Sequence, residues 1–248
     1  MWNPNAPRPT ARAEAKAEAQ AGIDAASEAL ARGAIADAEW QQRVAGALAA
    51  SYLAPEAAGD DPRWQSGFDG DAALWREARA LVLDAVPADA PRGASFLDVG
   101  CATGHLLECL DAWARERGLE LTLSGLELNP ALADAARRRL PAWAGRIYTG
   151  NVSDWTPPRR FLYVRTGLEY VPAGRGAALV ARLLRDVVAP GGRLIVGPVS
   201  GADVDAAVAA FAAAGVPDPG VLGATDRHGK TRHVVWGGPQ AGADARTA

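Results

Sequence analysis

After Gly93, short runs of β-forming residues alternate with longer stretches of helical periodicity. Strands that alternate with helices in this way form a mostly parallel sheet, which helices cover on both faces. The last two runs lie close together and predict a hairpin. We predict seven strands, at 95–99, 121–127, 146–149, 161–165, 193–197, 219–223 and 231–236.

The first 70 residues have a different texture and predict a helical cap. An alanine-rich stretch over 10–32 ends before Gly33, a common residue just after a helix. A second helix follows, because Trp40, Val44 and Leu48 recur on one helix face. We predict a helical cap with a lid loop over 1–70, the sheet domain over 71–237 and a disordered tail over 238–248.

Bulk composition is that of an ordinary globular protein. The chain has 248 residues, 49% apolar and 22% charged, with a formal net charge of −3. These totals lack the basic surplus of most nucleic-acid-binding proteins, so they disfavour a nucleic-acid partner. No apolar run approaches the roughly 20 residues that cross a bilayer, and neither a signal peptide nor a metal-binding Cys/His spacing is evident. We therefore predict a cytoplasmic protein with no membrane contact and no metal.

The segment FLDVGCATGHLLECL carries the most specific local signal. An apolar strand ends in Asp98, and the turn into the next helix has small residues at Gly100, Ala102 and Gly104. Small residues let a ligand approach the backbone, toward which the free N–H groups of the first helical turn point. A dinucleotide site needs the pattern G-x-G-x-x-G, whose last glycine would fall at His105. The turn therefore predicts a ligand other than a dinucleotide.

A second acidic residue, Glu127, ends the strand at 121–127. In doubly wound sheets an acid at this place accepts hydrogen bonds from ribose hydroxyls. With Asp98 at the other end, the pair suits a nucleoside that carries a cationic amino-acid arm. A strand-end acid of this kind is expected to contribute little to folding.

Together these motifs resemble those of class I S-adenosylmethionine-dependent methyltransferases. LDVGCATG is similar to the first motif of that family, LELNP to the second, and GNVSDW to the stretch that holds adenine. FLYVRTGLEYVP is similar to the strand and loop that face the methyl group, and APGGRLIV to the helix-turn-strand that follows. The resemblance covers about 95–200 in the right order. WQSGFDGD, upstream, adds a similarity to a bacterial subgroup without an assigned acceptor.

The resemblance implies a Rossmann-like α/β fold and S-adenosylmethionine as cofactor. In this family the last strand is antiparallel and lies beside the fifth. Asp98 would reach the ammonium group of the cofactor and Glu127 the ribose. The wall along the methionine arm would come from Gly100, Ala102 and Gly104, and the remaining contacts from Leu128, Asn151, Val152 and Thr166.

Glu169 and Tyr170 follow the fourth predicted strand, where this family handles its acceptor. Either is a candidate general base for a protonated acceptor, and the alternative is a role in starting a helix. Arg165 either binds an acidic acceptor or extends to the surface.

The loop Trp64–Asp71 lies where this family commonly folds a lid over the methionine arm. Ser66 and Gln65 would offer polar groups to the methionine carboxylate, and Phe68 would cover the site and exclude water. The alternative is a fixed linker whose aromatic residues plug the cap onto the sheet.

We predict methylation of a small molecule at oxygen or nitrogen. The loop at 166–170 lacks the Asn/Asp-Pro-Pro-aromatic pattern of amide and nucleobase enzymes, and the acidic ligands of metal-dependent catechol enzymes are missing. Three alternatives stay open: transfer of the aminocarboxypropyl group, a non-catalytic cofactor-binding protein, and a nucleic-acid methyltransferase with a basic face at 137–139 and 159–160. The acceptor and the oligomeric state are left undetermined.

Overall fold

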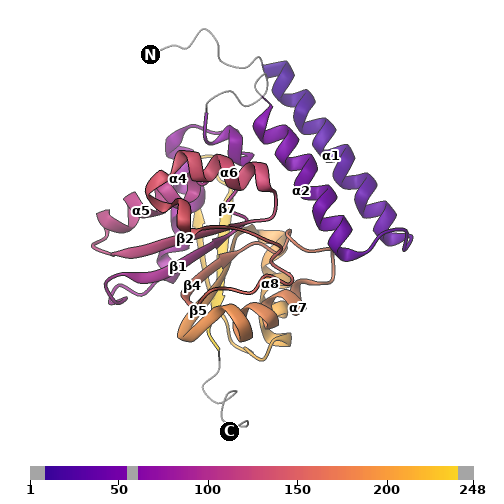
Figure 1. Cartoon of the computed structure of the whole chain (residues 1–248). Coiled ribbons are helices and arrows are strands. Elements are labelled where there is room, and N and C mark those ends of the chain that lie inside the picture. Colours follow the sequence, from indigo (N-terminus) through magenta and orange to yellow (C-terminus); the bar gives the residue numbers. More distant parts are fainter. Residues whose placement is uncertain (1–8, 55–60, 240–248) are drawn as a thin grey trace, which may run out of the picture.

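The computed structural model describes residues 9–54 and 61–239. Most of the predicted disordered tail therefore lies outside the described residues. A seven-stranded sheet in the order β3-β2-β1-β4-β5-β7-β6 forms the centre of the molecule (Figure 1). Its strands are β1 (Ala94–Val99), β2 (Leu121–Glu127), β3 (Ile147–Thr149), β4 (Phe161–Thr166), β5 (Val188–Ser200), β6 (Gly220–Thr225) and β7 (Thr231–Gly237).

The sheet confirms the predicted fold class. The first five strands pair in parallel, and β7 runs antiparallel to both β5 and β6. Because β7 lies between β5 and β6, the terminal hairpin closes this edge of the sheet as the family resemblance implied. None of the helices within residues 9–54 and 61–239 combines the length and apolar character needed to cross a membrane.

Helices cover both faces of the sheet (Figure 1). Successive side chains of a strand point to opposite faces, so Phe96 packs with the helices of one face and Leu97 with those of the other. The first face carries α4 (Ala72–Arg79), α5 (His105–Glu116) and α6 (Pro130–Arg139), and the second carries α7 (Gly176–Arg182) and α8 (Gly201–Ala213). Short helical turns complete the chain: η1 (Trp64–Ser66), η2 (Ala80–Ala85), η3 (Pro141–Arg146) and the π-helical η4 (Leu183–Val187).

Local sequence explains where the central helices begin. The Asn129 side chain accepts a hydrogen bond from the Ala131 N–H at 2.9 Å, and Pro130 occupies the first helical position of α6. Asp71 caps α4 in the same way by accepting from Leu74 N–H at 2.9 Å.

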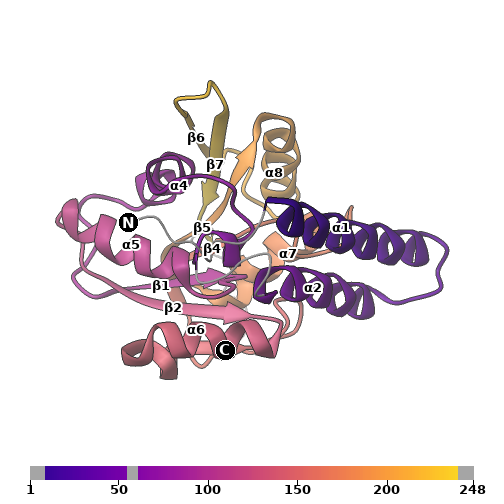
Figure 2. The same cartoon turned by 90° about the horizontal axis from the view of Figure 1, so that it is seen from above.

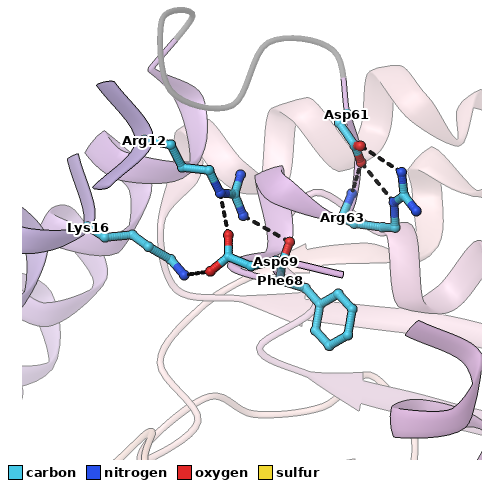
Figure 3. A network of polar contacts seen from close by, with 6 residues as sticks. All are labelled: Arg12, Lys16, Asp61, Arg63, Phe68 and Asp69. Atoms are coloured by element: carbon cyan, nitrogen blue, oxygen red, sulfur yellow. Dashed lines mark hydrogen bonds and ion pairs between the residues drawn. The ribbon is translucent and has the colours of Figure 1, made fainter. Parts of the chain in front are cut away.

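The N-terminal cap is a hairpin of α1 (Pro9–Ala31) and α2 (Asp37–Leu53), which lie side by side (Figure 2). Its helices approach closely: a Cβ atom added at Gly22 would lie 3.3 Å from the Cβ of Ala47. Charged side chains tie α1 to the loop before α4 (Figure 3). Arg12 and Lys16 both pair with Asp69, and Arg12 also donates to the Phe68 carbonyl oxygen at 2.9 Å.

Candidate functional site

A cavity of about 1260 Å³ lies between the cap and the carboxyl ends of β1, β2, β4 and β5. Pockets for one small molecule commonly measure about 300–1,000 Å³, so this cavity has room for two ligands. One face of α2 forms its roof. The roof residues are Trp40, Gln41, Val44, Ala45, Leu48 and Tyr52.

Most of the site residues predicted from the sequence line this cavity. They are Ser66, Asp98, Gly100, Ala102, Glu127, Leu128, Asn151, Val152, Glu169 and Tyr170. Gly104, Thr166 and Phe68 do not belong to its wall. The topology explains the gathering, because the carboxyl ends of neighbouring parallel strands meet at one edge of the sheet.

The turn between β1 and α5 has the left-handed backbone that small residues favour. Gly100 has φ +73° and Ala102 has φ +47°. A Cβ atom added at Gly100 would lie 2.4 Å from the ring of Tyr170, so the absent side chain allows that ring to pack on the turn. At Gly104, with φ +80°, an added Cβ would instead meet Leu140 at 2.9 Å. The small size of Gly104 thus serves the packing of α5 against the segment after α6.

Asp98 is buried at the base of the cavity and forms an ion pair with Arg165. The two residues are register partners on β1 and β4, and Arg165 Nη1 lies 3.1 Å from Asp98 Oδ1. The other oxygen, Oδ2, is buried and has no hydrogen-bond partner among the described residues. Burial raises the pKa of Asp98, although the charge of Arg165 opposes the rise. An orphaned acceptor of this kind calls for a donor from a ligand.

Arg165 does not extend to the surface, so that alternative is wrong. Only 7% of the residue is exposed. Its Nε donates to the Gly197 carbonyl oxygen at 2.7 Å, and its Nη1 also donates to the Tyr170 hydroxyl at 3.1 Å. Arg165 therefore holds Asp98 and Tyr170 in fixed positions at the cavity wall.

Glu127 joins the turns that follow β1 and β2. Its Oε2 accepts from the Ala102 N–H and its Oε1 from the Asn129 N–H, both at 2.9 Å. Burial raises the pKa of Glu127, and hydrogen bonds from these two backbone N–H groups oppose the rise. These bonds argue against the expectation that this acid contributes little to folding, because removing it would leave two N–H groups without an acceptor.

The proteins that this chain resembles in sequence are named as methyltransferases. No family model matches the chain. A trans-aconitate 2-methyltransferase from Methylobacterium radiotolerans is 34% identical over 119 residues, 47% of this chain and 42% of the relative. One from Methylobacterium nodulans is 36% identical over 117 residues, with the same two coverages of 47% and 42%. The match thus spans less than half the length of these curated relatives.

Among solved structures, the sugar N-methyltransferase KedS8 from Streptoalloteichus sp. is 20% identical, with a TM-score of 0.47 over 70% of this chain and 91% of that chain. The chain resembles class I methyltransferases in its strand order, in the two acids at the ends of β1 and β2, and in sequence over 47% of its length.

The loop after β3, which contains Asn151 and Ser153, is held to the cap by Gln41, a residue that sequence reasoning missed. Gln41 Oε1 accepts from Asn151 Nδ2 at 2.9 Å, and Gln41 Nε2 donates to the Tyr170 carbonyl oxygen at 2.8 Å and to Ser153 Oγ at 3.0 Å. The Asn151 side-chain oxygen accepts from the Ser153 N–H at 2.9 Å. The Asn151 amide is thus engaged within the protein. The only sequence signal was a glutamine on the buried face of an amphipathic helix.

The two candidate bases, Glu169 and Tyr170, occupy different environments. Tyr170 packs on Gly100, and burial raises the pKa of its phenol above the ordinary value. A phenol of this kind stays protonated at neutral pH and acts as a hydrogen-bond donor. Glu169 is exposed at the rim, with its carboxylate folded over Gly167. Of the two, only Glu169 presents a carboxylate to the cavity.

The loop Trp64–Asp71 contributes Ser66 and Gly67 to the cavity wall but turns Phe68 away from it. Phe68 packs edge-on against Trp75, with ring centres 5.1 Å apart, in the core beneath α4. The Ser66 hydroxyl donates to the Pro62 carbonyl oxygen at 2.9 Å. The position of Phe68 is that of a plug between the cap and the sheet.

Proposed function

We propose that this chain transfers a methyl group from S-adenosylmethionine to a small-molecule acceptor. The observation that carries the proposal is the pair of buried acids, Asp98 and Glu127, that line one cavity from neighbouring strand ends. Oδ2 of Asp98 has no partner among the described residues, and an ammonium group would satisfy it.

The other residues at this edge also fit the cofactor. Each Glu127 oxygen accepts one backbone N–H, so lone pairs are left for the ribose hydroxyls. Leu128 and Val152 offer apolar surface for adenine. Gly100 and Ala102 lie in the cavity wall beside these acids.

When bound, the cofactor supplies an electrophilic methyl group that is already activated by the sulfonium charge. The protein must then align the acceptor and exclude water. The face of α2 that roofs the cavity performs the exclusion. Glu169 takes the proton where the acceptor oxygen or nitrogen is protonated, and the Tyr170 hydroxyl, held by Arg165, donates a hydrogen bond.

Two features favour a small molecule over nucleic acid. The names of both Methylobacterium relatives fit a small-molecule acceptor. Within the predicted basic face, Arg137 pairs with Asp134 and donates to the Ile147 carbonyl oxygen, and Arg139 donates to the Thr103 carbonyl oxygen. These two guanidinium groups are engaged within the fold, which disfavours their use as phosphate ligands.

Calorimetry with S-adenosylhomocysteine tests the proposal, with NAD as the control ligand. We expect micromolar binding of S-adenosylhomocysteine, about −8 kcal/mol, and no response to NAD. Incubation with methyl-labelled cofactor and a metabolite extract should then yield a product whose mass has increased by a methyl group. Binding of NAD alone would contradict the proposal, a product enlarged by an aminocarboxypropyl group would replace it with that transfer, and cofactor binding without any product would indicate a non-catalytic binding protein.

A further inference from the structure

Arg79 is a cation in the cavity wall that forms no ion pair with the described carboxylates. It ends α4, and its guanidinium lies 5.2 Å from the ring centre of Trp75 and 5.6 Å from that of Phe68. Its hydrogen bond to the carbonyl oxygen of Ala78 is long, at 3.4 Å. Two aromatic rings therefore hold the guanidinium, while most of its five N–H donors stay available for another partner.

The charges around Arg79 favour a bound anion. Arg165, in the same wall, is already paired with Asp98 at 3.1 Å. Burial, and then the positive charges of Arg165 and Arg232, lower the pKa of Arg79 to about 10, while Tyr170 and Glu169 oppose the fall. The guanidinium stays charged at neutral pH. A partly enclosed cation near other cations is stabilised when an anion binds.

Tyr52 offers a second donor from α2. It lines the cavity, and its hydroxyl makes no hydrogen bond to the residues that the structure describes. Burial raises the pKa of Tyr52, with the charges of Glu127 and Glu169 adding to the rise and that of Arg79 opposing it. The phenol is therefore protonated, and its O–H is available to a ligand. The charge of Arg79 acts on this phenol, so the two groups can bind the same anion.

We propose that Arg79, assisted by the Tyr52 hydroxyl, is the binding site for a ligand carboxylate in this cavity. The inference rests on the proposed function. It adds a cationic site for an anionic ligand group, which the acids Asp98 and Glu127 cannot bind. A guanidinium binds a carboxylate through two parallel hydrogen bonds. The wall that α8 contributes contains one carboxylate, Asp203, and four alanines, Ala206, Ala209, Ala210 and Ala213. The alanines fit the apolar body of a ligand, and the carboxylate disfavours a multiply charged phosphate.

The carboxylate has two possible sources, the methionine arm of the cofactor or the acceptor. The first arm of the test compares S-adenosylhomocysteine with 5′-methylthioadenosine, which lacks the amino-acid arm, on wild type and Arg79→Gln. If the cofactor is the source, Arg79→Gln weakens S-adenosylhomocysteine binding by about tenfold or more, the scale of a charge-assisted hydrogen bond, and leaves 5′-methylthioadenosine unchanged. Arg79→Lys should retain part of the affinity.

The second arm uses the chain saturated with S-adenosylhomocysteine and a series of arylalkanoates with their matched amides. If the acceptor is the source, wild type prefers the acids and Arg79→Gln loses that preference, while the affinity for S-adenosylhomocysteine stays the same. Arg76→Gln is the matched control on the same helix, because Arg76 pairs with exposed Glu116 outside the cavity. Its binding should equal that of wild type in both arms.

The proposal is overturned if Arg79→Gln changes neither the affinity for S-adenosylhomocysteine nor the affinity for the arylalkanoates by more than twofold. Should that variant fail to fold, wild type decides. Equal binding of S-adenosylhomocysteine and 5′-methylthioadenosine, together with equal or no binding of acids and amides, would overturn the carboxylate site. A chain that binds neither S-adenosylhomocysteine nor 5′-methylthioadenosine would instead refute the proposed function, so the two failures are distinguishable.

Discussion

At the scale of single residues, the polar groups of the site differ in how many hydrogen-bond partners the protein gives them. Each oxygen of Glu127 accepts one backbone N–H, whereas Oδ2 of Asp98 and the hydroxyl of Tyr52 have no partner among the described residues. Buried polar groups with protein partners stabilise the fold, and buried polar groups without one are candidates for contact with a ligand. The same edge of the sheet thus contains one carboxylate with two protein donors and one with an unpartnered oxygen.

Glu127→Ala should reduce both cofactor affinity and folding stability. The ribose loses its acceptor, which should weaken S-adenosylhomocysteine binding by about 1.5–3 kcal/mol. The Ala102 and Asn129 N–H groups lose theirs, which should lower the free energy of unfolding by about 1–3 kcal/mol. Calorimetry and urea denaturation measure the two effects.

Glu127→Gln separates the effect on folding stability from the effect on cofactor affinity, because its amide retains one oxygen as an acceptor. We expect it to recover part of the lost stability. Cofactor affinity equal to wild type in Glu127→Ala would show that the ribose binds elsewhere.

At the scale of elements, the loop Trp64–Asp71 is anchored at several points. Asp69 pairs with Arg12 and Lys16 of α1, and Asp71 both caps α4 and pairs with Arg227 of the β6–β7 hairpin. Anchors of this kind, together with the burial of Phe68, favour a fixed plug in the second half of the loop (Figure 3). The first half, with Ser66 and Gly67 in the cavity wall, is where ligand contact is expected.

Hydrogen exchange distinguishes a plug from a lid. We expect the Phe68 N–H, which donates to the Arg63 carbonyl oxygen at 2.9 Å, to be protected with and without S-adenosylhomocysteine. A ligand-dependent gain should be confined to Ser66 and Gly67. In Asp69→Asn, exchange along α1 and the loop should accelerate, because two charged tethers are weakened. Protection at Phe68 that appears only with ligand would establish the lid instead.

At the scale of the whole molecule, the cap and the sheet domain share one cavity. Gln41 of α2 bonds to Asn151, Ser153 and the Tyr170 carbonyl oxygen, which belong to loops after β3 and β4. Ligand binding in the sheet domain should therefore be coupled to the docking of the cap. The sequence boundary drawn after residue 70 does not separate two independent sites.

Gln41→Leu tests this coupling. The change leaves half-buried polar groups of Asn151 and Tyr170 without partners. We therefore expect the free energy of unfolding to fall by about 1–3 kcal/mol and S-adenosylhomocysteine binding to weaken. Gln42→Leu is the matched control, since Gln42 is exposed on the same helix. Urea denaturation and calorimetry on both variants provide the measurement, and equal behaviour of the two would remove Gln41 from the coupling.

Much of the fold, and of the cavity wall at the carboxyl ends of the parallel strands, followed from the sequence alone. The strand runs, the turn with Gly100 and Ala102, and the Asn129 cap depend on residues that are neighbours in the chain, so local spacing predicts them. The positions of Asp98 and Glu127 followed as well, because acids at the ends of adjacent parallel strands must meet at one edge of the sheet.

Only the tertiary structure decided which side chains complete the site. The ion pair of Asp98 with Arg165 depends on the register of β1 with β4, and no local pattern specifies which residues of two distant strands become partners. The roles of Gln41 and Arg79 depend on how helices far apart in sequence pack over the strand ends. Packing between distant elements, unlike helix or strand periodicity, leaves no repeating signal in a single sequence, and this is why both residues escaped sequence reasoning.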